Sequence, residues 1–71
     1  MVKQTAKFRF GNRVRELRLK HGWTQRKLAR RAGISERYLQ RIESKQPPDV
    51  TLDVIAKLAR GFKLKCWEIV G

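Results

Sequence analysis

The sequence predicts an all-α fold of five short helices, and three observations predict it. Apolar residues recur at steps of three and four, which is the period of a helix that buries one face. Glycines and helix-capping residues interrupt these periods at short intervals. No stretch shows the convincing alternation of apolar and polar residues that is typical of a half-buried strand.

The first part of the chain predicts a basic arm and one helix. Residues 1–9 carry three cations and too few apolar residues to bury a face, so we expect a flexible arm. From Phe10 onward the apolar period predicts a helix over 10–21. Gly22 is expected to end this helix, because glycine enters the left-handed conformation without strain.

Two short helices are predicted next, with one glycine between them. Thr24 is a favourable N-cap for a helix over 25–32. Gly33 ends that helix, and Ser35 caps the next one over 36–44. Two helices this short and this close do not lie comfortably antiparallel, so we expect them to cross steeply. Their crossing is expected to rest on apolar inner positions: Leu28, Ala29, Leu39 and Ile42.

The remaining residues predict two more helices. A loop that contains both prolines separates them from the preceding pair. Thr51 is expected to cap a helix over 52–62, with an inner stripe formed by Leu52, Ile55, Leu58, Ala59 and Phe62. A closing helix over 66–70 completes a single domain over residues 10–71.

Composition limits the function classes. The chain has 71 residues with 18 Lys and Arg against 6 Asp and Glu, a net charge of +12, which favours a polyanion as partner. Within the second predicted helix we interpret Arg30 and Arg31 as charge that steers this partner from a distance. One His and one Cys are too few for a metal site, and no nucleophile or phosphate-loop motif is present. We therefore expect no metal, no cofactor and no enzymatic activity.

Residues 10–69 resemble the Cro/phage-repressor type of helix-turn-helix domain, also called lambda-repressor-like or Xre-type. The opening segment FGNRVRELRLKHGWTQRKLA is similar to that family's first helix and the start of its second. The helix-turn-helix register is matched without a gap by Thr24-Gln25, Leu28-Ala29, Gly33-Ile34-Ser35 and Tyr38-Leu39-x-Arg41-Ile42-Glu43. The resemblance implies a compact five-helix domain whose second and third helices form the motif.

The resemblance also implies a function. It predicts a sequence-specific regulator of transcription, a repressor that binds a palindromic operator in double-stranded DNA as a homodimer. The third helix would enter the major groove, with base contacts from Glu36, Arg37, Gln40 and Arg41. Phosphate contacts are expected from Gln25, Arg26, Ser35, Tyr38, Ser44, Lys45 and Gln46. For Tyr38, partial packing against the core is the alternative.

Three further expectations concern single residues. The family pairs a first-helix arginine with a glutamate near the end of the third helix, which correspond here to Arg18 and Glu43. Trp67 stands where the family usually has a polar residue, and we interpret it as a dimer contact. The alternative is that it folds back onto the first or fourth helix. Trp23 is expected in the core.

Several alternatives remain open at this point. An antitoxin would repress its own operon with the same domain and also bind a toxin protein. A restriction-modification controller would regulate neighbouring methyltransferase and nuclease genes. A ribosome- or RNA-binding protein without sequence preference is compatible with the net charge but not favoured by the helix-turn-helix register. Membrane binding is disfavoured, because the apolar stripes are needed for the core. The single Cys66 fits a reducing cytoplasm, and no apolar run is long enough for a membrane span. The resemblance implies a cytoplasmic, nucleoid-associated protein encoded by a bacterium or phage.

Overall fold

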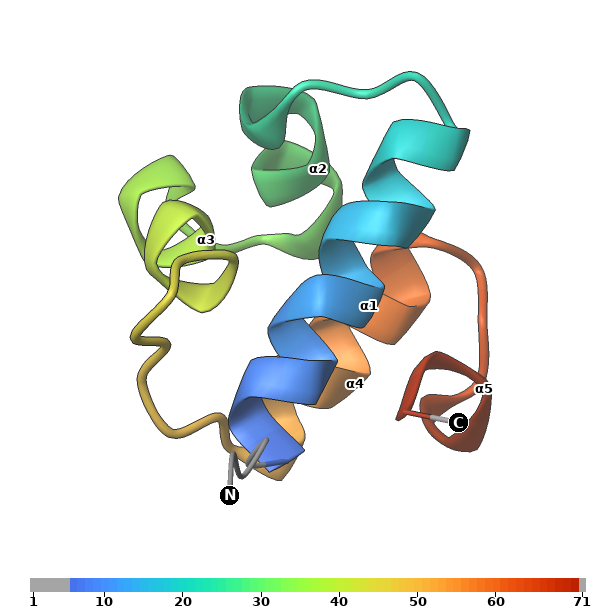
Figure 1. Ribbon diagram of the computed structural model, residues 1–71. Coiled ribbons are helices and arrows are strands. Elements are labelled where there is room, and N and C mark those ends of the chain that lie inside the picture. Colours follow the sequence, from blue (N-terminus) through green and yellow to red (C-terminus); the bar gives the residue numbers. More distant parts are fainter. Residues whose placement is uncertain (1–5, 71) are drawn as a thin grey trace.

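The computed structural model describes residues 6–70, and within that range it consists of helices without a strand (Figure 1). In chain order they are α1 (Ala6–Lys20), α2 (Gln25–Ala32), α3 (Glu36–Ile42), α4 (Leu52–Gly61) and α5 (Cys66–Val70). α2 packs against α3 and α4, whereas α5 packs against α4 and α1. α3 and α5 therefore lie at opposite edges of the molecule (Figure 1). The predicted all-α, five-helix fold is confirmed.

All five helices contribute to one hydrophobic core. The side chains with no more than 7% of their surface exposed are Phe10, Val14, Leu28, Ala29, Ala32, Leu39, Ile42, Leu58, Ala59, Phe62 and Ile69. Each fully buried Val, Leu or Ile stabilises the fold by about 1.5–3 kcal/mol relative to leaving it exposed. α5 has only five residues, too few to be stable alone, so its place depends on the burial of Ile69.

The predicted N-caps are all present. The side-chain oxygens of Thr24, Ser35 and Thr51 each accept a hydrogen bond from the backbone N–H three residues further on. Each cap residue has an extended backbone conformation, which turns the incoming chain away from the helix axis. These caps explain why α2, α3 and α4 begin at the residues that the sequence predicts.

α1 begins earlier than predicted. It starts at Ala6 instead of residue 10 and ends at Lys20 instead of residue 21, so the last part of the expected arm is helical. The prediction placed the start at Phe10, where the apolar period begins, and this side chain is buried in the structure. Alanine, lysine and arginine are favourable in helices, and no proline or glycine interrupts the chain before Phe10, so the helix begins before the apolar period does. The first five residues of the expected arm lie outside the described residues.

α3 and α4 end earlier than predicted. α3 ends at Ile42 instead of 44, and α4 ends at Gly61 instead of 62. At the end of α3, the Ser44 hydroxyl donates to the carbonyl oxygen of Arg41 at 2.6 Å. This local hydrogen bond satisfies a carbonyl that another helical turn would have used, and it closes the helix.

Leu52 does not join the inner stripe of α4. Its side chain is 83% exposed, whereas Val54 and Ile55 pack against the core. Leu52 is the first residue of the helix, and among the described residues no element covers that turn. The period of the stripe correctly predicts Leu58, Ala59 and Phe62, but it cannot show where the covering helices stop.

The turn between α1 and α2 packs on the end of α4 through aromatic rings. Trp23 is half-buried against the core, as expected, and its ring centroid lies 5.7 Å from that of Phe62. His21 stacks on Trp23 with centroids 4.2 Å apart. The Arg31 guanidinium carbon lies 4.4 Å from the centroid of the Trp23 ring, and Arg31 Nε donates to the carbonyl oxygen of Gly61 at 3.0 Å.

The interpretation of Arg31 as steering charge alone is therefore wrong. Its guanidinium holds α2 against the end of α4 by a cation–π contact and a hydrogen bond. The sequence did not reveal this role, because both partners are distant along the chain. Trp23 lies eight residues before Arg31, in a turn, and Gly61 lies thirty residues after it, at the end of α4.

Candidate nucleic-acid interface

The turn between α2 and α3 has the geometry that a helix-turn-helix requires. Gly33 has a φ of +76°, a conformation that glycine adopts without strain. The N–H groups of Gly33 and Ile34 donate back to the carbonyls of Arg30 and Ala29 at 3.3 and 3.0 Å. This pattern ends α2 and sends the chain directly into α3, so the two helices pack against each other across one turn.

Small residues let the helices of the site approach closely. At Gly11 of α1, a β-carbon would collide with the carbonyl oxygen of Ile42 at the end of α3 and lie 3.2 Å from its carbonyl carbon. At Gly61 of α4, a β-carbon would lie 3.3 Å from backbone atoms of Ala32 in α2. α1 and α4 therefore hold the helix-turn-helix by close backbone contact. The sequence prediction missed Gly11, because a glycine inside a helix gives no sign of what it faces.

One face of α3 is turned to solvent. Leu39 and Ile42 are fully buried, which fixes the rotation of the helix about its axis. The four predicted base-contacting residues share the opposite face, because they lie at positions i, i+1, i+4 and i+5: Glu36, Arg37, Gln40 and Arg41. The last three are exposed, and the Glu36 side chain is 41% exposed. The structure thus brings all four together on one accessible surface.

Glu36 has a cationic neighbour on α2. Its Oε1 lies 3.5 Å from Nε of Arg26, one of the predicted phosphate contacts. The pair joins the first turn of α2 to the first turn of α3. The Arg26 side chain is 74% exposed, so most of its guanidinium remains accessible.

Behind this surface, the structure brings Arg18 and Glu43 together as the resemblance implies. Arg18 Nε and Nη2 donate to the two oxygens of Glu43, both at 3.0 Å. The Glu43 side chain is 4% exposed and that of Arg18 is 12% exposed. Arg18 Nη1 also donates to the carbonyl oxygen of Trp23 at 2.9 Å. The pair therefore fixes α1, the following turn and the end of α3 to one another.

Gln25 joins the same network. Its Nε2 donates to Oε1 of Glu43 at 3.2 Å, which uses one of its two amide hydrogens. Gln25 and Arg26 are the first residues of α2, and the Thr24 cap takes the N–H of Lys27. The N–H groups of Gln25 and Arg26 are free of hydrogen bonds among the described residues, and the helix dipole is positive at this end. The first turn of α2 is thus suited to an anion.

The other predicted phosphate contacts surround α3. Ser35 is exposed as the N-cap, Tyr38 is half-buried against the core, and Lys45 and Gln46 are exposed in the following loop. Ser44 differs from these residues. Its hydroxyl and its backbone N–H both donate to the carbonyl of Arg41, so neither donor remains for a phosphate.

Trp67 lies on α5, away from this surface. Its side chain is 67% exposed, and Nζ of Lys65 lies 5.0 Å from its ring centroid. Among the described residues it does not fold back onto α1 or α4, the alternative that the sequence left open. Arg13 on α1 holds α5 in place by donating to the carbonyl oxygen of Glu68 at 3.3 Å.

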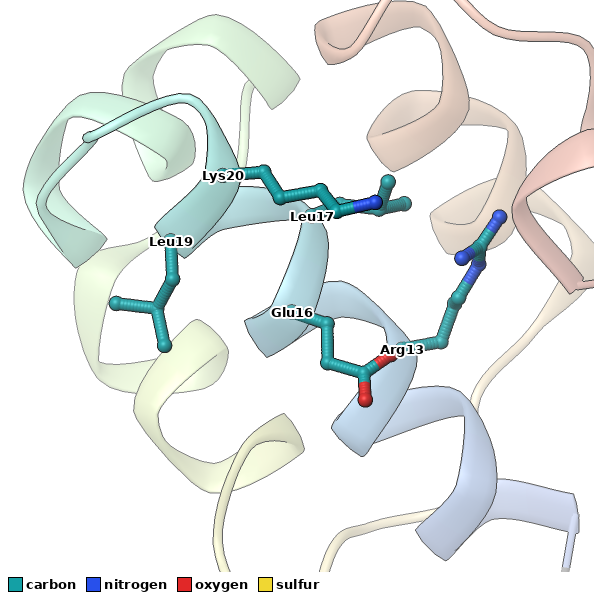
Figure 2. A pocket seen from close by; sticks show the side chains of 5 residues that line it. All are labelled: Arg13, Glu16, Leu17, Leu19 and Lys20. Carbon is teal, nitrogen blue, oxygen red and sulfur yellow. The ribbon is translucent and has the colours of Figure 1, made fainter.

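A hollow outside this surface is open to solvent. A shallow hollow on α1 is lined by Arg13, Glu16, Leu17, Leu19 and Lys20, whose side chains diverge instead of converging on one centre (Figure 2). The described residues contain no group of three or more His, Cys, Asp or Glu suited to a metal ion. None of the described helices is long and apolar enough to span a membrane.

Comparison with known families agrees with this geometry. Residues 14–66 match a helix-turn-helix family model, and this range includes α2, α3 and α4 completely. The chain belongs to the Cro/C1-type helix-turn-helix family. Members of this family are DNA-binding regulators of transcription, and the chain is one of them.

Solved structures of helix-turn-helix proteins resemble the chain over most of its length. The restriction-modification controller protein C.AhdI from Aeromonas hydrophila is 35% identical, with a TM-score of 0.81 over 89% of this chain and 94% of that one. A hypothetical transcription factor, NHTF from Neisseria, is 24% identical, with a TM-score of 0.85 over 100% of this chain and 80% of that one. The controller protein C.Esp1396I is 18% identical, with a TM-score of 0.81 over 96% and 90%. Because NHTF and C.Esp1396I are less than 25% identical to this chain, their likeness supports its fold alone. No curated protein matches the sequence.

Proposed function

We propose that this helix-turn-helix protein is a sequence-specific repressor that binds a palindromic operator as a homodimer, with α3 in the major groove. The observation that supports this proposal is the outward face of α3, because four side chains that can read bases share it. Two of them, Arg37 and Arg41, suit bidentate contacts with guanine, and Gln40 suits adenine. Glu36 suits the amino group of cytosine.

Phosphate contacts would hold α3 in this position. The first turn of α2 offers two free N–H groups, the second amide hydrogen of Gln25 and the exposed guanidinium of Arg26. On the other side of α3, Lys45 and Gln46 are exposed, and Ser35 and Tyr38 carry hydroxyl groups near the helix start. Ser44 is left out of this proposal, because its donors are used within the protein.

The proposal is tested by selecting bound duplexes from a random pool and by footprinting the selected site. The expected result is a short inverted repeat with half-sites about one helical turn, or 34 Å, apart. Arg37→Ala is expected to abolish the preference at one base pair in each half-site, a loss of about 1–3 kcal/mol in binding free energy to the preferred sequence.

Lys27→Ala is the matched control, since Lys27 is exposed in α2 and lies outside the predicted base-reading face. It is expected to weaken binding to all sequences alike. Equal affinity of the unsubstituted protein for selected and random duplexes would contradict sequence-specific binding.

We propose that the homodimer forms through α5. Trp67 offers a large exposed ring, the type of side chain that carries most binding energy in protein interfaces. α5 lies at the opposite edge from α3 (Figure 1). In a dimer that reads two successive half-sites on one face of DNA, the two α3 helices would lie about 34 Å apart.

Trp67→Ser tests the interface. The expected result is a shift of the sedimentation coefficient from dimer to monomer, and at least tenfold weaker binding to the full operator, with unchanged weak binding to an isolated half-site. Leu19→Ser is the control, because Leu19 is also an exposed apolar side chain, at 57%, but lies on α1. If Leu19→Ser disrupts the dimer and Trp67→Ser leaves it intact, the interface does not lie on α5.

Among narrower roles, a specific observation favours a controller of restriction and modification genes. C.AhdI is such a controller protein, and it is similar in sequence as well as in fold, with 35% identity over 89% of this chain. The proposal predicts methyltransferase and endonuclease genes beside the gene for this protein, and an operator upstream of them. No comparison supports a toxin as partner, so the antitoxin alternative is not proposed.

A further inference from the structure

Glu36 is the one exposed acidic side chain of the helix-turn-helix. Residues 24–46 contain two acids, and the other, Glu43, is 4% exposed and faces Arg18. A carboxylate at the start of α3 would face the phosphates of a bound duplex and be repelled by them. A carboxylate at this position is therefore compatible with DNA binding if it meets a hydrogen-bond donor on a base edge.

Arg26 supplies the opposite charge beside this carboxylate. The distance between Arg26 Nε and Glu36 Oε1 is 3.5 Å, and the two side chains are 74% and 41% exposed. Pairs as exposed as this one contribute little to folding stability. The consequence of the pair is therefore local. It restricts the direction of the Glu36 carboxylate and screens it from nearby negative charge.

The guanidinium has donors for two partners. Nε of Arg26 lies 3.5 Å from Glu36 Oε1, and the terminal nitrogens of Arg26 donate no hydrogen bond to another described residue. A guanidinium carries five N–H donors in a fixed plane, so the terminal pair can contact a phosphate while Nε stays beside the carboxylate.

We propose that Arg26 is a positioning residue for Glu36, which it holds for contact with the amino group of a cytosine in the major groove. Cytosine suits a carboxylate better than adenine does, because the amino group of adenine lies next to the acceptor N7, which repels the second carboxylate oxygen. The inference rests on the proposed function. It adds that one specificity contact is built by both α2 and α3, and that an α2 arginine influences which base is chosen.

The test measures affinity for four duplexes. Glu36→Gln identifies the relevant base pair, as the position whose cytosine preference disappears in a selection from random duplexes. Fluorescence anisotropy then gives the dissociation constants for the selected operator and its three single-base variants at that position. The proteins compared are unsubstituted, Arg26→Met, Arg30→Met and Arg26→Met/Glu36→Gln, and thermal melting checks that each is folded. Arg30→Met is the matched control, because Arg30 is an exposed arginine one turn further along α2.

The unsubstituted protein is expected to prefer cytosine by about tenfold or more at this position. Arg30→Met is expected to weaken binding to all four duplexes alike and to keep that preference. Arg26→Met is expected to weaken binding and also to reduce the preference at least threefold. In the Glu36→Gln background, Arg26→Met is expected to change no preference at all.

Two other outcomes would overturn the inference. Equal weakening of all four duplexes by Arg26→Met, or a cytosine preference that survives Glu36→Gln, would show that Arg26 does not position a base-reading carboxylate, while sequence-specific binding would still stand. An unsubstituted protein without any base preference would overturn the proposed function itself and this inference with it.

Discussion

Glu43 shows how a single buried charge positions the DNA-binding surface. Its two oxygens accept hydrogen bonds from Arg18 and Gln25, so the end of α3 is connected to α1 and to the first turn of α2. We expect Glu43→Ala to lower the free energy of unfolding by about 3 kcal/mol, because it leaves the nearly buried Arg18 unpaired. That is a large share of the roughly 3–5 kcal/mol that a core of this size provides.

Urea denaturation followed by circular dichroism measures this loss. Glu16→Ala is the matched control, since Glu16 is an exposed glutamate of α1. It is expected to change stability by less than about 0.5 kcal/mol. If Glu43→Ala is no more harmful than Glu16→Ala, the network does not hold the helices together.

At the scale of helices, three of them end in the same way. α1, α2 and α4 each close with a left-handed residue, Gly22, Gly33 and Lys63 respectively. In each case the next N–H donates back to a carbonyl in the last turn: Trp23 to Arg18, Ile34 to Ala29, and Leu64 to Ala59. This arrangement directs an apolar residue back toward the core after each helix. The repeated motif explains how short helices close into one compact core.

Lys63 is the unfavourable member of this set. Its φ is +60°, a left-handed conformation that costs a residue with a β-carbon about 1–2 kcal/mol. Lys63→Gly removes that cost but adds roughly 0.5–1 kcal/mol of backbone entropy loss on folding. We therefore expect a net gain of about 0.5–1 kcal/mol, visible as a higher melting temperature. Lys63→Ala removes the same charge and keeps the β-carbon, so it is expected to bring no such gain. A gain of equal size in Lys63→Ala would attribute the effect to charge.

These helix ends also show how far sequence reasoning reaches. The ends at Gly22 and Gly33 were predictable, because glycine there has a local physical cause, and so were the caps at Thr24 and Ser35. Lys63 gives no comparable signal. The outward face of α3 was predictable from Leu39 and Ile42, because helix period depends on the sequence alone.

Contacts between segments that are distant along the chain were harder to predict from the sequence. The pairing of Arg18 with Glu43 came from resemblance to a family, since nothing in the spacing of 25 residues requires it. The contacts of Arg31 with Trp23 and Gly61, and of Arg26 with Glu36, depend on how helices pack and were found only in the structure.

For the whole molecule, the net charge of +12 divides into two kinds of cation. Arg13, Arg18 and Arg31 are held by a carbonyl, a carboxylate or an aromatic ring of the protein. Others, including Lys45 beside α3, are exposed and have no partner among the described residues. Cations of the second kind are available to replace the counterions of DNA, and so is Arg26, because its pairing with Glu36 leaves most of its guanidinium accessible. The salt dependence of binding should therefore separate the two kinds.

Lys45→Met and Arg31→Met make this comparison. Each phosphate contact contributes about −0.9 to the slope of log K against log salt concentration for duplex DNA. Lys45→Met is expected to make that slope shallower by about one contact, to leave the base preference unchanged and to leave the melting temperature nearly unchanged. Arg31→Met is expected to lower the melting temperature and to leave the slope unchanged, because its guanidinium binds α4 and Trp23. Anisotropy titrations at several salt concentrations measure the slopes. A shallower slope for Arg31→Met without loss of stability would show that Arg31 contacts DNA and does not hold α2 against α4.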